Sequence, residues 1–312
     1  MDILLCGSFD DDERNKWLET LAAAFPDGRW HVTKEAVDPR QIRAAVVANP
    51  LPGSLLGLPN LELIQSLWAG VDRLMQDESL PAQVPIARMV DPAMNQAMAE
   101  TALWATLSLH RRFYRYAAQQ HSGQWRQMPQ RRADEVRVTV MGMGQMGQRC
   151  AGALAAQGYP VTGWRTKRGI TEAGIDIHTG ADALTRLLAE SEVVINLLPL
   201  TPDTRGILDA RLFAAMRPGA GLVNLARGAH LIEADLLAAL ASGQVGHAVL
   251  DVFNEEPLPV DHAFWGHPQV TLLPHVAAMT DNRSASAMVA KNLRALRDAR
   301  PLANLVDRER GY

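Results

Sequence analysis

Three glycines at fixed spacing, between a predicted strand and a predicted helix, constrain the fold of this chain more than any other feature. The β-branched run of residues 136–141 leads into Gly142, Gly144 and Gly147, and a helical stretch over residues 148–157 follows. The first glycine permits a tight turn, the second lets the backbone approach a pyrophosphate, and the third lets the helix pack against the strand. The helix N-terminus adds unpaired N–H groups for phosphates. The arrangement predicts a dinucleotide-binding unit; the alternative is a tight turn with a purely structural role.

Strand-like and helix-like segments alternate along all 312 residues, which favours an α/β protein with parallel sheets. Before the glycine turn we expect a small open sheet, then a long helix over residues 93–120 and a polar linker over residues 124–134. The strands expected in that sheet are residues 3–7, 44–48, 61–66 and 86–90, with a helix over residues 12–24. After the glycine turn the alternation continues to residue 274, and a last helix spans residues 281–300.

That last helix is too short to form a domain of its own, so we expect it to pack on the first part of the chain. The predicted architecture is a Rossmann-type dinucleotide-binding domain, residues 99–281, inserted into a smaller flavodoxin-like α/β substrate domain. The substrate domain comprises residues 1–98 and 282–312, and we expect the substrate cleft between the two domains.

Composition narrows the partners and the compartment. The chain has 31 Lys and Arg against 34 Asp and Glu, interspersed, so no basic block points to nucleic acid or a membrane surface. Its acidic cluster, residues 10–13, precedes a predicted helix and is better suited to capping it than to binding metal. Two cysteines, Cys6 and Cys150, fit a reducing compartment. Without a secretory signal or a membrane-spanning apolar run, the chain is predicted to be cytoplasmic, with no metal.

Three polar side chains downstream of the glycine turn each follow a hydrophobic run. Arg227 follows residues 221–226, Glu256 follows residues 247–253, and His275 follows residues 270–274. Because ligands of open parallel sheets bind beyond the carboxyl ends of the strands, we expect these three to converge. A guanidinium can grip a carboxylate through two hydrogen bonds, and a carboxylate-paired imidazole can transfer a proton. The set suits reduction of a 2-oxo acid by a nicotinamide cofactor.

These strings resemble the signature set of the D-isomer-specific 2-hydroxyacid dehydrogenases. The resemblance rests on Asn-Leu-Ala-Arg-Gly at residues 224–228, on residues 250–258 and on residues 273–277, and it covers nearly the whole chain. Residues 68–72, 194–199 and 306–312 narrow it to the bacterial glyoxylate/hydroxypyruvate reductases of the A type. The resemblance implies NADPH-dependent reduction of glyoxylate to glycolate and of hydroxypyruvate to D-glycerate. It also implies a homodimer, for which the 93–120 stretch and the loop around Trp125 are candidates.

The resemblance assigns a role to each of the three side chains. Arg227 would hold the substrate carboxylate and polarise its carbonyl, and His275 would donate a proton to the carbonyl oxygen. Glu256, which directly precedes a proline, is the acid that would pair with His275 and favour its protonated form. Structural alternatives stay open: Arg227 capping a loop, Glu256 as an ordinary surface acid, and His275 as a hydrogen-bonded structural histidine.

The loop at residues 68–72 is the predicted substrate contact outside the dinucleotide unit. The resemblance implies that backbone N–H groups of Trp68, Ala69 and Gly70 bind the substrate carboxylate, and Gly70 exposes its backbone because it lacks a Cβ. The family more often has a small residue where Trp68 stands. Trp68 either narrows the site toward very small substrates or packs between the domains. Thr280 is a further candidate substrate contact.

The basic loop after the second strand of the unit indicates the cofactor. NAD enzymes usually carry an acid about 20 residues after the glycines, for the ribose hydroxyl. Here Trp164 is followed by Arg165, Thr166, Lys167 and Arg168, with no acid. The cations would neutralise a 2′-phosphate and Thr166 would donate a hydrogen bond to it, whereas the alternative is a solvated basic loop. We expect NADP(H) to be preferred, with NAD(H) also possible.

Further cofactor contacts are expected in the glycine turn and at later strand ends. Leu198 and Pro199 would lie near the nicotinamide, and Asp251 would accept a hydrogen bond from its carboxamide by the same resemblance. The other expected contacts are Gln145, Met146, Trp164, Thr204, Ala226 and Arg227, together with the three glycines.

Two other functions fit part of these observations. The first is a dehydrogenase of another small 2-hydroxy acid. The second is a dinucleotide-sensing interaction protein, because some members of the superfamily are transcriptional corepressors. A protein of that second kind is expected to carry disordered tails for its partners, and this chain has almost none.

Overall fold

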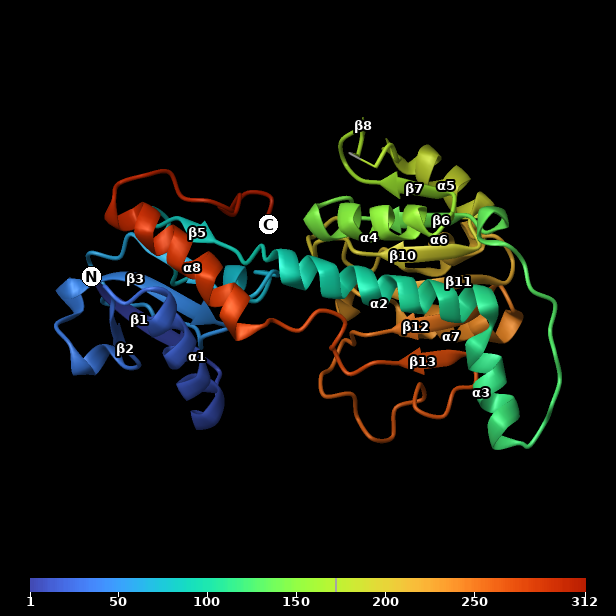
Figure 1. The fold of residues 1–312 in the computed structure, drawn as a ribbon, viewed down its shortest axis with the longest axis horizontal. Helices are drawn as coiled ribbons and strands as arrows, with labels where there is room; N and C mark the ends of the chain where they lie inside the picture. Colours follow the sequence, from blue (N-terminus) through green and yellow to red (C-terminus); the bar gives the residue numbers. More distant parts are fainter. Residues whose placement is uncertain (172) are drawn as a thin grey trace. The chain divides into compact units, whose positions relative to one another are not determined.

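The computed structural model describes residues 1–171 and 173–312 and divides the chain into two compact units. One unit is discontinuous and comprises Met1–Met94 with Thr280–Tyr312, and the other comprises Asn95–Met279. Each unit has its own sheet with helices beside it, so the predicted α/β class is confirmed (Figure 1). In the part of the chain that the structure describes, no helix is long and apolar enough to cross a membrane.

The discontinuous unit has a five-stranded parallel sheet in the order β2-β1-β3-β4-β5, the flavodoxin-like order. Helices α1 and α8 lie side by side against it (Figure 1). Asp10 caps α1 by accepting the Glu13 N–H at 2.8 Å, as its sequence position predicts. The elements are β1 (Asp2–Gly7), α1 (Asp11–Ala24), β2 (Arg29–His31), η1 (Lys34–Ala36), η2 (Pro39–Gln41), β3 (Ile42–Ala48), β4 (Leu63–Ser66), η3 (Leu74–Gln76), β5 (Ile86–Ala87) and α8 (Asn282–Arg297).

The continuous unit has an eight-stranded sheet in the order β13-β12-β11-β10-β6-β7-β9-β8, parallel except for the β8–β9 pair. The chain passes from β6 outward through β7 and then returns to pair β10 on the other side of β6. Ligands of such sheets bind beyond the strand ends at this reversal. The strands are β6 (Val138–Met141), β7 (Val161–Trp164), β8 (Gly169–Ile170), β9 (Asp176–His178), β10 (Val193–Asn196), β11 (Ala220–Asn224), β12 (Val245–Leu250) and β13 (Val270–Leu272).

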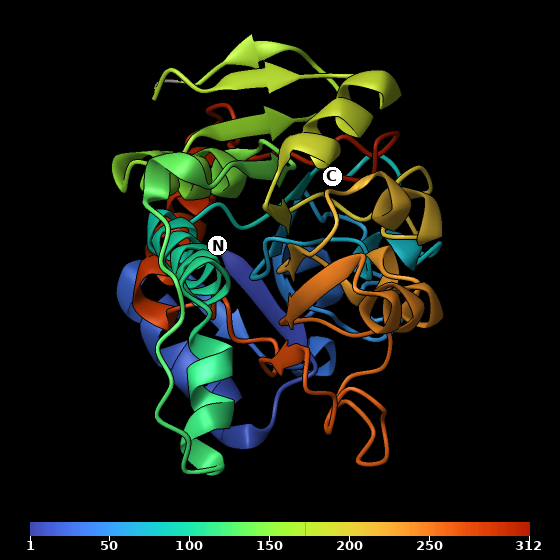
Figure 2. The same cartoon turned by 90° about the vertical axis from the view of Figure 1, so that its right-hand side faces the viewer.

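Helices cover both faces of this sheet because successive strand residues point to opposite sides. Val193 and Ile195 of β10 pack with α2 and α4, while Val194 packs with α5, α6 and α7. Figure 2 shows the two groups of helices on the two sides of the sheet. The helices are α2 (Pro92–Arg111), α3 (Phe113–His121), η4 (Ala133–Glu135), α4 (Gln145–Ala156), α5 (Ala181–Glu190), α6 (Ala210–Ala215), η5 (Gly228–His230) and α7 (Glu233–Ser242).

The prediction of one helix over residues 93–120 is wrong. The chain breaks at Arg112, which has a left-handed φ of 59°, and α3 leaves in a new direction. That conformation costs about 1–2 kcal/mol, and α3 offsets it with contacts. The Tyr114 ring stacks on His247 at 3.7 Å between centroids, and the Tyr116 hydroxyl accepts the Met128 N–H at 3.0 Å. Sequence reasoning also missed β2, β8 and β9, which are two or three residues long and have no clear alternation of apolar residues; β2 and β8 are edge strands.

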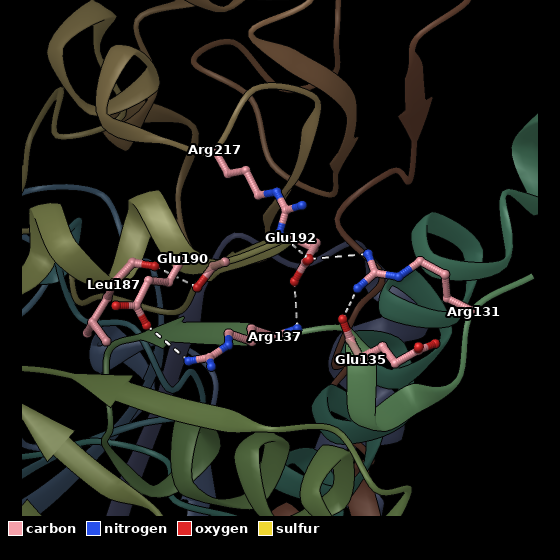
Figure 3. A network of polar contacts seen from close by, with 8 residues as sticks. Arg131, Glu135, Arg137, Leu187, Glu190, Glu192 and Arg217 are labelled. Atoms are coloured by element: carbon pink, nitrogen blue, oxygen red, sulfur yellow. Dashed lines mark hydrogen bonds and ion pairs between the residues drawn. The ribbon is translucent and has the colours of Figure 1, made fainter.

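Glu192, at the amino end of β10, binds the polar segment that follows α3 through Arg131 (Figure 3). The Glu192 carboxylate accepts from Arg217 at 2.5 Å, from Arg131 at 3.2 Å and from the Arg137 backbone N–H at 2.7 Å. Its side chain is only 16% exposed, so these donors compensate a largely buried charge. On α2, His110 adds a second attachment by contacting the Arg131 carbonyl at 2.9 Å. The end of the predicted linker is therefore fixed to the unit.

Candidate active site

The three predicted catalytic side chains follow β11, β12 and β13, which are neighbours in the sheet. Because these strands are parallel, their carboxyl ends meet at one edge of the sheet. The structure brings His275 and Glu256 together, with His275 Nδ1 2.7 Å from Glu256 Oε2. The other oxygen, Oε1, accepts the Phe253 N–H at 2.9 Å. An ionised carboxylate only accepts, so Nδ1 carries a proton in this contact and the Nε2 atom is left for other partners.

A buried carboxylate, Asp251, holds the backbone around His275. Its carbonyl accepts the His275 N–H at 2.8 Å, and its two carboxylate oxygens accept the N–H groups of Val276 (2.8 Å) and Ala277 (3.0 Å). These bonds stabilise His275 in a left-handed conformation, with φ of 54°. Burial raises the pKa of Asp251, while the two N–H donors act in the opposite direction. The hydrogen bonds to Asp251 therefore fix the backbone from which the His275 imidazole extends.

A glycine joins the Arg227 loop to the Glu256 loop. A Cβ placed on Gly228 would lie 1.9 Å from the carbonyl carbon of Phe253, so no larger residue fits. The loop after β11 thus contacts the backbone just before Glu256. The Arg227 side chain donates from Nη1 to the Ala226 carbonyl at 2.7 Å. Ala226 itself, a predicted cofactor contact, is 7% exposed.

Two glycines of the turn leave no room for a side chain, whereas the third faces open space. Gly142 has φ of 96°, and its Cβ would lie 2.4 Å from the Leu197 carbonyl oxygen. A Cβ on Gly147 would lie 1.8 Å from the Gly142 oxygen. A Cβ on Gly144 would meet nothing within 4 Å, and α4 starts at the next residue, Gln145. The helix N-terminus and the open side of Gly144 together make a cradle that suits a pyrophosphate.

The basic loop lies beside this turn. Arg165 Nη1 donates to the Met143 carbonyl at 3.1 Å, and its Nε donates to the Lys167 carbonyl at 2.8 Å. Thr166, Lys167 and Arg168 are exposed. The Trp164 indole N–H donates to the Gly180 carbonyl at 3.0 Å, which fixes the start of the loop. A cluster of cations therefore stands next to the phosphate cradle.

The comparisons with known proteins agree with this geometry. The model of the NAD binding domain of D-isomer specific 2-hydroxyacid dehydrogenases matches residues 103–277. This chain belongs to the D-isomer specific 2-hydroxyacid dehydrogenase family. Among its relatives is the glyoxylate/hydroxypyruvate reductase A of Serratia proteamaculans, which is 39% identical over 303 residues, 95% of this chain and 96% of the relative.

Two solved structures of this family cover 100% of the chain and 99% of their own length. A D-isomer specific 2-hydroxyacid dehydrogenase from Xanthobacter autotrophicus Py2, in complex with NADPH, is 36% identical and superposes with a TM-score of 0.93. The NADPH-dependent glyoxylate/hydroxypyruvate reductase of Sinorhizobium meliloti, in complex with NADP and sulfate, is 34% identical with a TM-score of 0.91.

Three further expected cofactor contacts, Leu198, Pro199 and Thr204, lie in the loop after β10. The Leu198 N–H donates to the Asn196 side chain at 3.3 Å, and the Thr204 hydroxyl donates to the Pro199 carbonyl at 2.7 Å. Gln145 is exposed at the start of α4 and Met146 is half-buried. These residues follow the carboxyl ends of β6 and β10, the edge at which open parallel sheets bind ligands.

The predicted substrate loop and Thr280 belong to the discontinuous unit. The Trp68 N–H is donated to Ser66 Oγ at 3.0 Å, and the Trp68 carbonyl accepts the Met89 N–H at 3.0 Å. Its ring meets the buried Trp17 ring of α1 edge to face, 6.3 Å between centroids. Ala69 and Gly70 are half-buried. The Trp68 side chain is thus packed on α1 of its own unit.

Sequence reasoning missed three fully buried polar side chains next to Arg227: Asn196, Asn224 and His230. Each asparagine is the last residue of a buried strand. An asparagine at the end of an otherwise apolar run is the signal that could have drawn attention to them, because a buried amide needs partners.

Proposed function

We propose that this chain is an NADPH-dependent reductase of small 2-oxo acids that converts glyoxylate to glycolate and hydroxypyruvate to D-glycerate. The observation that carries the proposal is the 2.7 Å contact of His275 with Glu256, at strand ends adjacent to the Arg227 loop. The named activities of the Serratia and Sinorhizobium relatives support the choice of substrates.

The proposed chemistry assigns one task to each side chain. Arg227 holds the substrate carboxylate and draws electron density from the neighbouring carbonyl. His275, as an imidazolium, donates the proton on Nε2 to the carbonyl oxygen and is left neutral. Glu256 stabilises the imidazolium through Nδ1 and fixes the ring. NADPH, when bound, would supply the hydride for the carbonyl carbon, so that one hydride and one proton would convert the 2-oxo acid to the 2-hydroxy acid.

The residues around the glycine turn fit NADP(H). Gly144 and the start of α4 would hold the pyrophosphate, and Arg165, Thr166 and Arg168 would hold the 2′-phosphate. The NADPH and NADP complexes of the two relatives support this preference. Leu198 and Pro199 would line the nicotinamide side. Each carboxylate oxygen of Asp251 accepts one backbone N–H and can accept a second hydrogen bond. One of them would accept the N–H of the nicotinamide carboxamide.

The roles of the two units follow from the same proposal. Residues 99–281 would bind the dinucleotide, and residues 1–98 with 282–312 would complete the substrate site. Because the Trp68 N–H is taken by Ser66, the backbone N–H groups of Ala69 and Gly70 are the proposed ligands of the substrate carboxylate. Thr280 would add a polar contact, and Trp68 would limit the size of the substrate.

We extend the proposal to assembly and compartment. Trp125 is 96% exposed, and Phe113 and Trp104 add further exposed aromatic surface on the α2–α3 stretch. Apolar exposure of this extent supports a homodimer through these residues. Cys6 and Cys150 are both free thiols, which supports a reducing compartment and hence the cytoplasm.

Initial rates with glyoxylate, hydroxypyruvate and pyruvate, each with NADPH and with NADH, test the proposal. We expect turnover of the first two acids to exceed that of pyruvate, and NADPH to be preferred. Tight NADPH binding without turnover of any of these acids would contradict the reductase and favour a dinucleotide-sensing protein.

A further inference from the structure

Three buried polar side chains connect the ends of β10 and β11. Asn196 ends β10, Asn224 ends β11, and the two are register partners in the sheet. His230 ends the short η5 turn that follows Arg227. All three are 0% exposed, so each polar atom needs a partner inside the protein.

Backbone donors determine the orientation of each group. Asn196 Oδ1 accepts the Leu198 N–H at 3.3 Å, so its Nδ2 is the donor, to Asn224 Oδ1 at 3.0 Å and to His230 Nδ1 at 3.1 Å. An amide nitrogen only donates, so His230 Nδ1 accepts and the ring proton is on Nε2. That proton is directed at the Pro199 carbonyl, 3.3 Å away.

The other end of the network is Arg227. Asn224 Nδ2 donates to the Arg227 carbonyl at 3.1 Å, and the His230 backbone N–H donates to the same carbonyl at 3.2 Å. Asn224 Oδ1 also accepts the Ala226 N–H at 3.3 Å. One histidine therefore connects the backbone of Arg227 with the loop that contains Leu198 and Pro199.

We propose that His230 is a positioning residue for the reduction, which sets the Arg227 backbone through Asn196 and Asn224 and sets the nicotinamide-side loop through Pro199. The inference rests on the proposed function, because the roles of Arg227 and Pro199 come from it. In this account His230 touches neither substrate nor cofactor. A displacement of about 1 Å at a reacting group can cost on the order of 10²-fold in rate, so small shifts of Arg227 are measurable.

Two conservative variants separate the two halves of the network. His230→Gln keeps an N–H donor for Pro199 but loses the acceptor for Asn196, so we expect kcat/KM for glyoxylate to fall about 10-fold with little change in KM for NADPH. His230→Asn keeps an acceptor for Asn196 but loses the donor to Pro199, so we expect KM for NADPH to rise more than KM for glyoxylate. Asn196→Asp, which removes both donors and keeps the acceptor for Leu198, should resemble His230→Gln.

His247→Gln is the matched control. His247 is the other buried histidine described in this unit, and its contacts are Thr271 and Tyr114, away from the strand ends. We expect its kinetic constants to stay within about twofold of the parent even if Tm falls. The inference is overturned if all His230 and Asn196 variants keep the parent constants. It is also overturned if His247→Gln loses as much kcat/KM as they do at an equal fall in Tm. If the His230 variants do not fold, Asn196→Asp decides alone. An inactive parent would instead contradict the proposed function.

Discussion

The two ends of the eight-stranded sheet both carry ionisable side chains but combine them differently. At the amino ends, Glu192 accepts from Arg217, Arg131 and a backbone N–H, and arginine does not lose its proton in proteins. At the carboxyl ends, Glu256 faces His275, a residue type that ionises near neutral pH. The same kind of acid is thus a fixed anchor beside two arginines, and in the proposed mechanism it is the partner of the proton donor beside a histidine.

Two arginines at opposite ends of β11 give the largest test of this comparison. Arg227→Ala should lower kcat/KM for glyoxylate by about 10²–10³-fold, because a donor aimed at developing charge is lost, while NADPH still binds. Arg217→Ala, the matched control at the amino end, should leave kinetics near those of the parent and lower stability. Steady-state rates and fluorescence titration with NADPH measure both. Near-normal turnover of Arg227→Ala would remove the basis for placing the substrate at this edge.

His247, on β12, separates pH effects on stability from those on catalysis. Burial lowers the pKa of His247 to about 4, and Arg115 and His267 act in the same direction. An unfolded histidine titrates near about 6.5. The unfolded chain therefore binds a proton first as pH falls, so this part of the stability is complete above about pH 6.5 and is lost toward pH 4. The loss approaches about 3 kcal/mol. Urea unfolding at pH 7.5, 5.5 and 4.5 should show a flatter pH dependence for His247→Gln, and equal slopes would refute this.

The basic loop provides a test at the cofactor end. Arg165→Ala combined with Arg168→Ala should raise KM for NADPH about 10-fold or more and leave KM for NADH almost unchanged. The two arginines would contact only the 2′-phosphate, which NADH lacks. Lys16→Ala, on α1 in the other unit, is a surface-charge control. An unchanged preference between the two cofactors would mean that the loop is only a solvated turn.

Glu192→Gln should have the smallest effect and only on folding. Loss of the charge weakens two arginine contacts of a side chain that is 16% exposed, so we expect a destabilisation of about 1–3 kcal/mol. Glu190→Gln, which disturbs an exposed pair with Arg137, should cost no more than about 0.5 kcal/mol. Urea unfolding compares the two variants. A loss of catalysis in Glu192→Gln at unchanged stability would contradict the role of a structural anchor.

Several of the features that the sequence predicted have a local backbone cause. Gly142 needs its left-handed φ of 96° and Gly147 needs room beside the Gly142 oxygen, both within the turn itself, so their spacing is visible in the chain. The fold class followed from alternating periodicity. The partnership of Asn196, Asn224 and His230 was invisible, because single polar residues from separate strand ends meet only in the folded sheet. The break at Arg112 was missed for a similar reason, since Tyr114 of α3 stacks on His247, which lies far along the chain.

A double-mutant cycle on Glu256 and His275 tests the central claim most directly, namely that Glu256 acts through His275. kcat/KM for glyoxylate with NADPH would be measured for the parent, Glu256→Gln, His275→Ala and the double variant. His275→Ala should cost about 10²–10⁴-fold, and Glu256→Gln about 10-fold or more in the parent. In the His275→Ala background the Glu256 change should cost less than about twofold, because there is no imidazole left to hold. Independent costs that multiply in the double variant would contradict the account.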